Sequence, residues 1–180
     1  MRRFFASFLE VFEIALVAVG AVFLIRTFLI QPFLVSGSSM VPNFQDGDYL
    51  LVDQVTYRFR APERGEVVVF RSPGNESTYF VKRIIGLPDE TMEISGGKIF
   101  LVKDDGREEL KEPYLPPGFS TRGEEKFSLG EGEYLFLGDN RSFSFDSRSW
   151  GALSYEHIVG LVRIRLWPID EIRAFAAPSY

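Results

Sequence analysis

The stretch Val35-Ser36-Gly37-Ser38-Ser39-Met40-Val41-Pro42-Asn43 separates the most apolar part of the chain from its first clear strand, and the rest is organised around it. Serine and glycine side chains cannot fill a hydrophobic core, and Pro42 prevents a helix from running through the stretch. We therefore expect an exposed, sharply turned loop. Taken alone, the loop fits a plain polar linker better than a nucleophile, because loops rich in Ser and Gly are common.

The composition indicates one domain with an appendage and excludes several kinds of site. A chain of 180 residues, 46% hydrophobic with 18 Phe, is long enough for a real core and rich enough in apolar residues for membrane contact. Its net charge of −5 provides no basic field, so no nucleic-acid partner is expected. With no Cys and one His, a thiol nucleophile, a disulfide and a His cluster for a metal are excluded, and we expect no cofactor.

Residues 9–30, upstream of the loop, predict a single transmembrane helix. At about 1.5 Å per residue, this segment spans roughly 33 Å, enough to cross the hydrocarbon of a bilayer. The uninterrupted apolar run Ile14–Ile25 is shorter, so a core helix or a cleaved signal peptide is the alternative. Strongly apolar sequence continues past the possible cleavage sites, which favours an anchor that stays attached. Two arginines near the N-terminus place residues 1–8 in the cytoplasm and residues 31–180 outside the plasma membrane.

The remainder of the chain predicts a mainly β domain, an antiparallel sheet with protruding hairpins. Gly96-Gly97 suits a hairpin turn, and Glu112–Glu125, rich in Pro, Gly and charge, predicts a mobile loop. Short helical turns are expected near Tyr155–Ile158 and Asp170–Phe175. The predicted strands are apolar or alternating runs bounded by turn residues: Asp48–Val55, Glu66–Arg71, Thr78–Ile85, Met92–Ser95, Lys98–Val102, Glu133–Leu137 and Val159–Trp167.

Lys82 is the second candidate for chemistry. Strand alternation places it on one face with two large apolar neighbours, Phe80 and Ile84. Burial disfavours an ammonium ion and lowers its pKa, and a lysine general base at neutral pH needs a pKa of about 7–8. From the strand pattern alone, a lysine that extends along the strand edge to solvent is the commoner arrangement.

A third candidate is the polar run at residues 138–151, Gly-Asp-Asn-Arg-Ser-Phe-Ser-Phe-Asp-Ser-Arg-Ser-Trp-Gly. It follows a strand, and a loop whose Asp and Asn side chains bond their own backbone would account for it. Its density of hydroxyls and charges is nevertheless unusual. Asp146 and Arg148 are two residues apart, so we expect a partly buried ion pair that fixes the loop.

Taken together, these blocks resemble the type I signal (leader) peptidase family of membrane-anchored serine proteases. Each block is weak alone, but four of them in the family's order behind a membrane segment are specific. The resemblance covers nearly the whole chain, from the anchor to about Trp167. The blocks are residues 36–43 (Ser-Gly-Ser-Ser-Met-Val-Pro-Asn), 64–70 (Arg-Gly-Glu-Val-Val-Val-Phe), 79–88 (Tyr-Phe-Val-Lys-Arg-Ile-Ile-Gly-Leu-Pro) and 138–151.

The resemblance implies a Ser-Lys dyad. Ser39, directly before Met-x-Pro, matches the nucleophile, and Lys82 matches the general base that replaces the His of better-known triads. Ser144 matches the hydroxyl that orients the lysine. Asp146 and Arg148 match the family's structural ion pair.

The resemblance also implies an oxyanion site and pockets for small residues. The backbone N–H of the nucleophilic serine should be one oxyanion donor. Some members add a serine hydroxyl two residues earlier, where this chain has Gly37, so a backbone or water donor would have to substitute. The positions that match the pocket walls are Phe33, Val35, Phe80 and Val81.

Three departures from the family pattern leave local loop conformation open without changing a catalytic position. Residues 86–90 read Gly-Leu-Pro-Asp-Glu where Gly-Leu-Pro-Gly-Asp is usual, and residues 140–144 read Asn-Arg-Ser-Phe-Ser where Asn-Arg-Asp-Asn-Ser is usual. Asn43 stands where Thr is usual.

The expected function is that of a signal peptidase I, an endopeptidase that removes signal peptides with small residues at −1 and −3 from preproteins at the lipid bilayer. It needs no metal, and we expect a monomer. One rival is a self-cleaving Ser-Lys domain of the SOS-repressor type, which should be soluble and carry an internal Ala-Gly bond that this chain lacks. The other is a membrane-tethered β domain without catalytic activity, in which Lys82 would titrate near its ordinary pKa.

Overall fold

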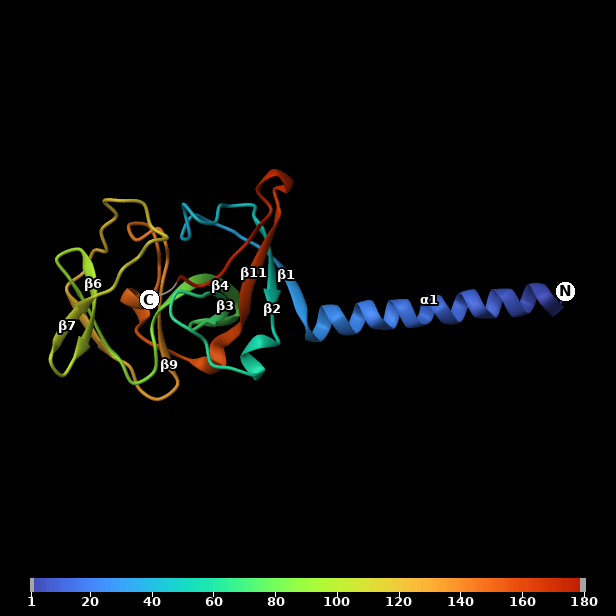
Figure 1. The fold of residues 1–180 in the computed structure, drawn as a ribbon, viewed down its shortest axis with the longest axis horizontal. Helices are drawn as coiled ribbons and strands as arrows, with labels where there is room; N and C mark the ends of the chain where they lie inside the picture. The colour runs from blue at the N-terminus through green and yellow to red at the C-terminus, as the bar shows by residue number, and fades with distance from the viewer. Residues whose placement is uncertain (1, 179–180) are drawn as a thin grey trace.

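A computed structural model describes the backbone of residues 2–178 and the side chains of residues 9–23 and 29–178. A long helix, α1 (Arg2–Phe28), extends away from a body of β-strands that forms the rest of the chain (Figure 1). Within the part whose side chains are described, no helix is both long enough and apolar enough to cross a bilayer. The membrane anchor at residues 9–30 is therefore not confirmed.

The main sheet has eight strands, all paired antiparallel, and its first strand, β1 (Ile30–Leu34), lies at one edge. Along the sheet the order continues with β2 (Tyr49–Asp53), β11 (Ile158–Trp167), β3 (Val67–Ser72), β4 (Asn75–Gly86), β9 (Glu133–Leu137) and β10 (Leu153–Ser154), and β12 (Arg173–Ala174) pairs with β11.

A second sheet of four strands lies at the opposite end of the body from α1 (Figure 1). Its order is β7 (Gly106–Glu109), β6 (Lys98–Lys103), β5 (Thr91–Ser95) and β8 (Glu125–Ser128). Buried Met92 and Ile94 of this sheet pack in one cluster with Ile85, Leu135 and Leu137 of the main sheet. This shared core joins the two sheets.

Strand β3 is buried on both faces, as the continuous apolar run of its sequence predicts. Val67 and Val69 pack in the cluster that lies beneath the Ser39 loop, whereas Val68 and Phe70 pack in a second cluster with Phe136. Each such side chain contributes about 1.5–3 kcal/mol when it is removed from water. The position of β4, the neighbour of β3, is therefore strongly fixed.

Most predicted elements are confirmed, and the differences have physical reasons. The segment Asp170–Phe175 is not one helical turn: η3 (Ile169–Glu171) is followed by β12, because its backbone pairs with β11. A strand that was not predicted, β1, follows directly on α1, and the short segments α2 (Ser147–Trp150) and η1 (Thr56–Arg58) were not predicted either. The helical turn expected near Tyr155–Ile158 is confirmed as η2 (Tyr155–His157). The region expected to be a mobile loop, Glu112–Glu125, contains buried Thr121 and the ion pair of Glu112 with buried Arg141.

Candidate active site

The loop that carries Ser39 is closed at its base. Val35 N–H donates to Asp48 O at 2.9 Å, and Gly47 N–H donates to Val35 O at 3.0 Å. Inside the loop, Met40 and Phe44 are buried in the cluster beneath it. Ser39 is partly exposed between these anchored points, so the structure presents its hydroxyl at the surface as the sequence predicts.

Gly37 occupies a backbone conformation that suits glycine, with φ of 97°. Its N–H donates to Asp46 Oδ1 at 2.7 Å. The amide of Gly37 is thus already engaged in holding the loop, and the position offers no side-chain hydroxyl.

The side chains of Lys82 and Ser39 form a direct hydrogen bond. Lys82 Nζ donates to Ser39 Oγ at 2.8 Å and to Val81 O at 3.0 Å. The side chain of Lys82 does not extend to solvent, since the residue is only 3% exposed and its Nζ lies 5.3 Å from the centre of the Phe80 ring. Alternation placed Lys82 with Phe80 as expected, but the arrangement that the strand pattern alone favoured, a lysine extending to solvent, is wrong.

Burial lowers the pKa of Lys82 from its ordinary value of 10.5 to about 8, against the opposing charges of Asp146 and Asp139. At neutral pH about a tenth of such amines are uncharged, roughly a few hundred times more than for an exposed lysine. A neutral amine at hydrogen-bond distance from a hydroxyl can accept its proton. The pair has the geometry and the pKa of a base and its nucleophile.

The turn after β9 fixes Ser39 from the other side. Asn140 N–H donates to Ser39 O, and Asn140 Nδ2 donates to Ser38 O, both at 3.0 Å. Gly138 lies so close that a Cβ built on it would be 2.4 Å from Ser39 O and 2.1 Å from Ser144 Oγ. Only glycine allows the turn and the loop to approach this closely.

Ser144 lies near this junction but does not hydrogen-bond Lys82. Its Oγ is buried and has no hydrogen-bond partner among the described residues. The expected contact from this hydroxyl to the lysine is thus absent here, because the Oγ is directed at the backbone of Gly138. A buried hydroxyl without a hydrogen-bond partner is costly in free energy, which makes Ser144 unusual among the buried side chains of the described residues.

The expected ion pair between Asp146 and Arg148 is present. Arg148 Nε and Nη2 each donate to one oxygen of the Asp146 carboxylate at 2.8 Å. Asp146 is fully buried and also accepts from Gly138 N–H at 3.1 Å. The pair therefore connects the short helix α2 to the turn that contacts Ser39.

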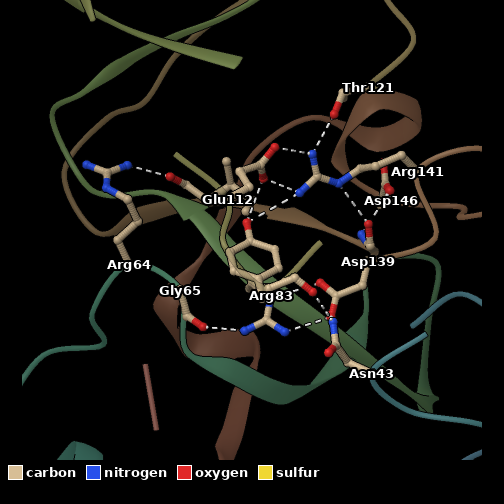
Figure 2. A network of polar contacts seen from close by, with 12 residues as sticks. Asn43, Arg64, Gly65, Arg83, Glu112, Thr121, Asp139, Arg141 and Asp146 are labelled. Carbon is tan, nitrogen blue, oxygen red and sulfur yellow. Dashed lines mark hydrogen bonds and ion pairs between the residues drawn. The ribbon is translucent and has the colours of Figure 1, made fainter. Parts of the chain in front are cut away.

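Asp139 links all three segments of the site, and sequence reasoning missed it. Arg83, the residue after Lys82, donates to both oxygens of Asp139, at 2.8 and 2.6 Å, and to Gly65 O at 2.7 Å (Figure 2). Asn43 Nδ2, from the loop of Ser39, donates to Asp139 Oδ2 at 2.8 Å. The sequence signal was the placement of Arg83, Asp139 and Asn43 in the motif blocks, but nothing in the sequence alone connects them.

The residues expected to line pockets do share one cavity. It has a volume of about 100 Å³ and is lined by Phe33, Val35, Phe80 and Val81 together with Ser39 and Lys82, and also by Leu34, Ser36, Met40, Val69 and Tyr79. A larger apolar cavity of about 570 Å³ lies where α1 meets the sheet and contains none of the site residues. The small cavity beside the Ser-Lys pair suits a side chain of the size of alanine.

Comparison with known proteins identifies relatives over most of the chain. The family model described as "Signal peptidase, peptidase S26" matches residues 8–167. A signal peptidase I of Leptolyngbya laminosa is 34% identical over 86% of this chain and 77% of its own length. Signal peptidase IB of Staphylococcus aureus is 31% identical over 87% of this chain and 88% of its own length. A solved signal peptidase I from Enterococcus faecalis has a TM-score of 0.48 and 28% identity, covering 57% of this chain and 97% of that chain.

Proposed function

The chain belongs to the signal peptidase family, peptidase S26, and on that premise we propose the part that each residue of the site plays in catalysis. It is a serine endopeptidase that removes N-terminal signal peptides from exported preproteins. Neither rival interpretation, the self-cleaving repressor domain or the non-catalytic tethered domain, accounts for this family membership.

Ser39 is the nucleophile and Lys82 the general base. Neutral Lys82 takes the proton of the Ser39 hydroxyl as Oγ attacks the carbonyl carbon of the scissile bond. The resulting ammonium returns that proton to the leaving amine, so the mature protein departs and the signal peptide stays as an ester on Ser39. Lys82 then takes a proton from water as the water oxygen attacks the ester carbonyl. Its ammonium returns that proton to Ser39 Oγ, and the signal peptide leaves as a free carboxylic acid. The 2.8 Å contact between Nζ and Oγ supports this sequence of steps.

The substrate is an extended segment added to the open edge of the main sheet. Strand β1 lies at that edge, and its Phe33 lines the cavity beside the dyad. Backbone hydrogen bonds along the edge give affinity, and a cavity of about 100 Å³ selects small side chains, typically Ala, at −1 and −3.

The oxyanion is stabilised by the backbone N–H of Ser39 and by a second hydrogen-bond donor that is not the N–H of Gly37. The N–H of Gly37 is engaged by Asp46, which leaves a bound water or substrate-ordered group as the second donor. Ser144 turns its unpartnered hydroxyl to Lys82 during the reaction and orients the amine. Asp146 and Arg148 keep that serine and Gly138 in place.

Proteins of this type are associated with membranes, and residues 9–30 anchor this one in a single pass with residues 1–8 in the cytoplasm. Phe143, Phe145 and Leu34 near the site are 78%, 62% and 56% exposed. Such exposed apolar side chains suit contact with the outer leaflet, where the scissile bond of a preprotein lies. The dyad is complete within one chain, in keeping with a monomer.

The contact between Ser39 Oγ and Lys82 Nζ carries the proposal, and two substitutions test it. Ser39→Ala and Lys82→Ala should each abolish cleavage of a preprotein in detergent, while the far-ultraviolet circular dichroism of the β body stays unchanged. Sequencing the new N-terminus of the product identifies the bond that is cut. Full activity of either folded variant would remove the dyad from the mechanism.

A further inference from the structure

Residues 112–121, here called the strap, leave the second sheet and return to it. At its start, Leu110 N–H donates to Ile99 O of β6 at 2.8 Å, and at its end Thr121 N–H donates to Gly97 O at 2.8 Å. Between these ties the strap has no helix or strand. The position of the strap is therefore set by these ties to the second sheet and by the residues that its side chains contact.

One of those side chains holds the turn that contacts Ser39. Glu112 forms an ion pair with Arg141, which is 2% exposed, and Arg141 also donates to Thr121 Oγ1 (Figure 2). From the same guanidinium, Nε donates to Gly138 O at 3.0 Å. A buried cation needs such partners, so the strap supplies the counter-charge that keeps Arg141 against Gly138.

A second strap residue, Tyr114, contacts both other segments of the active site. Its ring lies over the guanidinium of Arg83, with 3.9 Å between Cζ and the ring centre, and its carbonyl oxygen accepts from Asn43 Nδ2 at 2.9 Å. Its hydroxyl donates to Glu112 Oε1 at 2.6 Å. Arg83 follows Lys82 on β4, and Asn43 belongs to the loop of Ser39.

We propose that the strap is a positioning element of the active site, through which the second sheet holds the nucleophile loop, strand β4 and the turn at Gly138 in register. The inference rests on the proposed dyad. The three segments that must bring hydroxyl and amine together are each contacted by Glu112 or Tyr114, directly or through Arg141. A displacement of about 1 Å between reacting groups can lower a rate about 100-fold, so a segment with these contacts acts on turnover as well as on stability.

Two pairs of variants separate positioning from stability. Glu112→Gln removes the charge that pairs with buried Arg141, and Glu109→Gln, three residues earlier, is its control because Glu109 pairs with Lys98 at the exposed surface. Asn43→Ala removes both amide contacts, whereas Asn43→Thr keeps one hydroxyl donor and is the residue usual in the family. All are compared in the full-length protein with a preprotein that has Ala at −1 and −3, at a temperature where circular dichroism finds every variant folded.

We expect Glu112→Gln and Asn43→Ala to lower kcat about tenfold or more while KM changes by less than about threefold, because ground-state binding is retained. Asn43→Thr should recover part of the loss, and Glu109→Gln should match the unsubstituted protein. Equal kcat in Glu112→Gln and Glu109→Gln, or a loss explained wholly by the unfolded fraction, would overturn the inference.

Tyr114→Leu allows a second measurement, the pH dependence of kcat/KM. This dependence would not change if the strap only stabilised the fold. Without the ring, Arg83 holds Asp139 less firmly, and the charges that act on Lys82 are those of Asp139 and Asp146. The acid limb of kcat/KM against pH should move to higher pH in Tyr114→Leu and stay in place in Glu109→Gln. If the acid limb of Tyr114→Leu stays at the pH of the unsubstituted protein, the proposed effect of the strap on the dyad is wrong. If the unsubstituted protein cleaves no preprotein at all, the proposed function fails instead, which distinguishes the two failures.

Discussion

Lys82 is a buried amine whose charge opposes folding. Because its pKa falls from 10.5 to about 8, the protonated form costs roughly 3 kcal/mol in the folded state. The cost is fully present below about pH 8, shrinks as pH rises towards the unfolded pKa, and is absent above it. Lys82→Met should therefore raise the free energy of unfolding near pH 7 by up to that amount, less the lost contact to Ser39.

Urea unfolding of both proteins near pH 7 and near pH 10 measures this difference, and the advantage of the methionine variant should be smaller at the higher pH. A gain of the same size at both pH values would show that the lysine is not desolvated in the folded protein.

Arg148 affects the same amine through Asp146. The charge of buried Asp146 raises the pKa of Lys82, and its pairing with Arg148 partly offsets that effect. Arg148→Gln should move the acid limb of kcat/KM to a higher pH and lower kcat/KM near pH 7. A pH titration of the cleavage rate checks this, with Arg107→Gln on the exposed second sheet as the control. A lower rate with an unmoved acid limb would assign Arg148 a purely structural part.

For single residues, the sequence predicts the surroundings and partners that follow from local patterns, but not contacts between residues far apart in the chain. Alternation along one strand places Lys82 with Phe80 and Ile84, although the same pattern favoured a lysine that reaches solvent, and the pair Asp146–Arg148 follows from a spacing of two. Asp139 was missed because its partners Arg83 and Asn43 are 56 and 96 residues away, and no local pattern links them.

Among the elements, the turn after β9 depends on the absence of one methyl group. A Cβ on Gly138 would approach Ser39 O and Ser144 Oγ to within 2.4 and 2.1 Å, closer than real side chains come. Gly138→Ala should lower the melting temperature by several degrees and kcat by about tenfold or more, because the turn and the nucleophile loop must separate. Gly74→Ala, whose Cβ would meet nothing within 4 Å, is the matched control. Similar behaviour of both variants in thermal unfolding and cleavage assays would disprove the steric argument.

Seven strands were predictable from apolar periodicity, whereas β1 and the structure of the region Glu112–Glu125 were not. Pro, Gly and charge indicated mobility, whereas Glu112 and Thr121 bind Arg141 beside the active site. Charged residues in a loop are ordinarily solvated, and only tertiary structure reveals that their partner is a buried arginine. Composition therefore misjudges loops that take part in a polar network.

For the whole molecule, the sequence predicts a β body with an N-terminal helix, and from the packing of the described residues we expect the body to fold without the helix. The three hydrophobic clusters of the described residues draw only on residues 33–175 and contain none from α1. The division of the body into two sheets with a common core was not predicted, since Ile85 and Leu137 each belong to strands of the main sheet but pack with the second.

If α1 serves only as the anchor, removing residues 1–28 should leave the body folded. The shortened protein should retain the melting temperature of the full-length protein and cleave a soluble peptide with Ala at −1 and −3 at a similar kcat/KM. Its cleavage of a preprotein embedded in vesicles should fall at least tenfold, because the dyad is no longer held at the surface where the scissile bond lies. Flotation with vesicles measures the anchor directly: the full-length protein should float and the shortened one should not. Full-length protein that stays with the aqueous fraction would contradict the anchor, whereas a shortened protein that unfolds would show that α1 stabilises the β body.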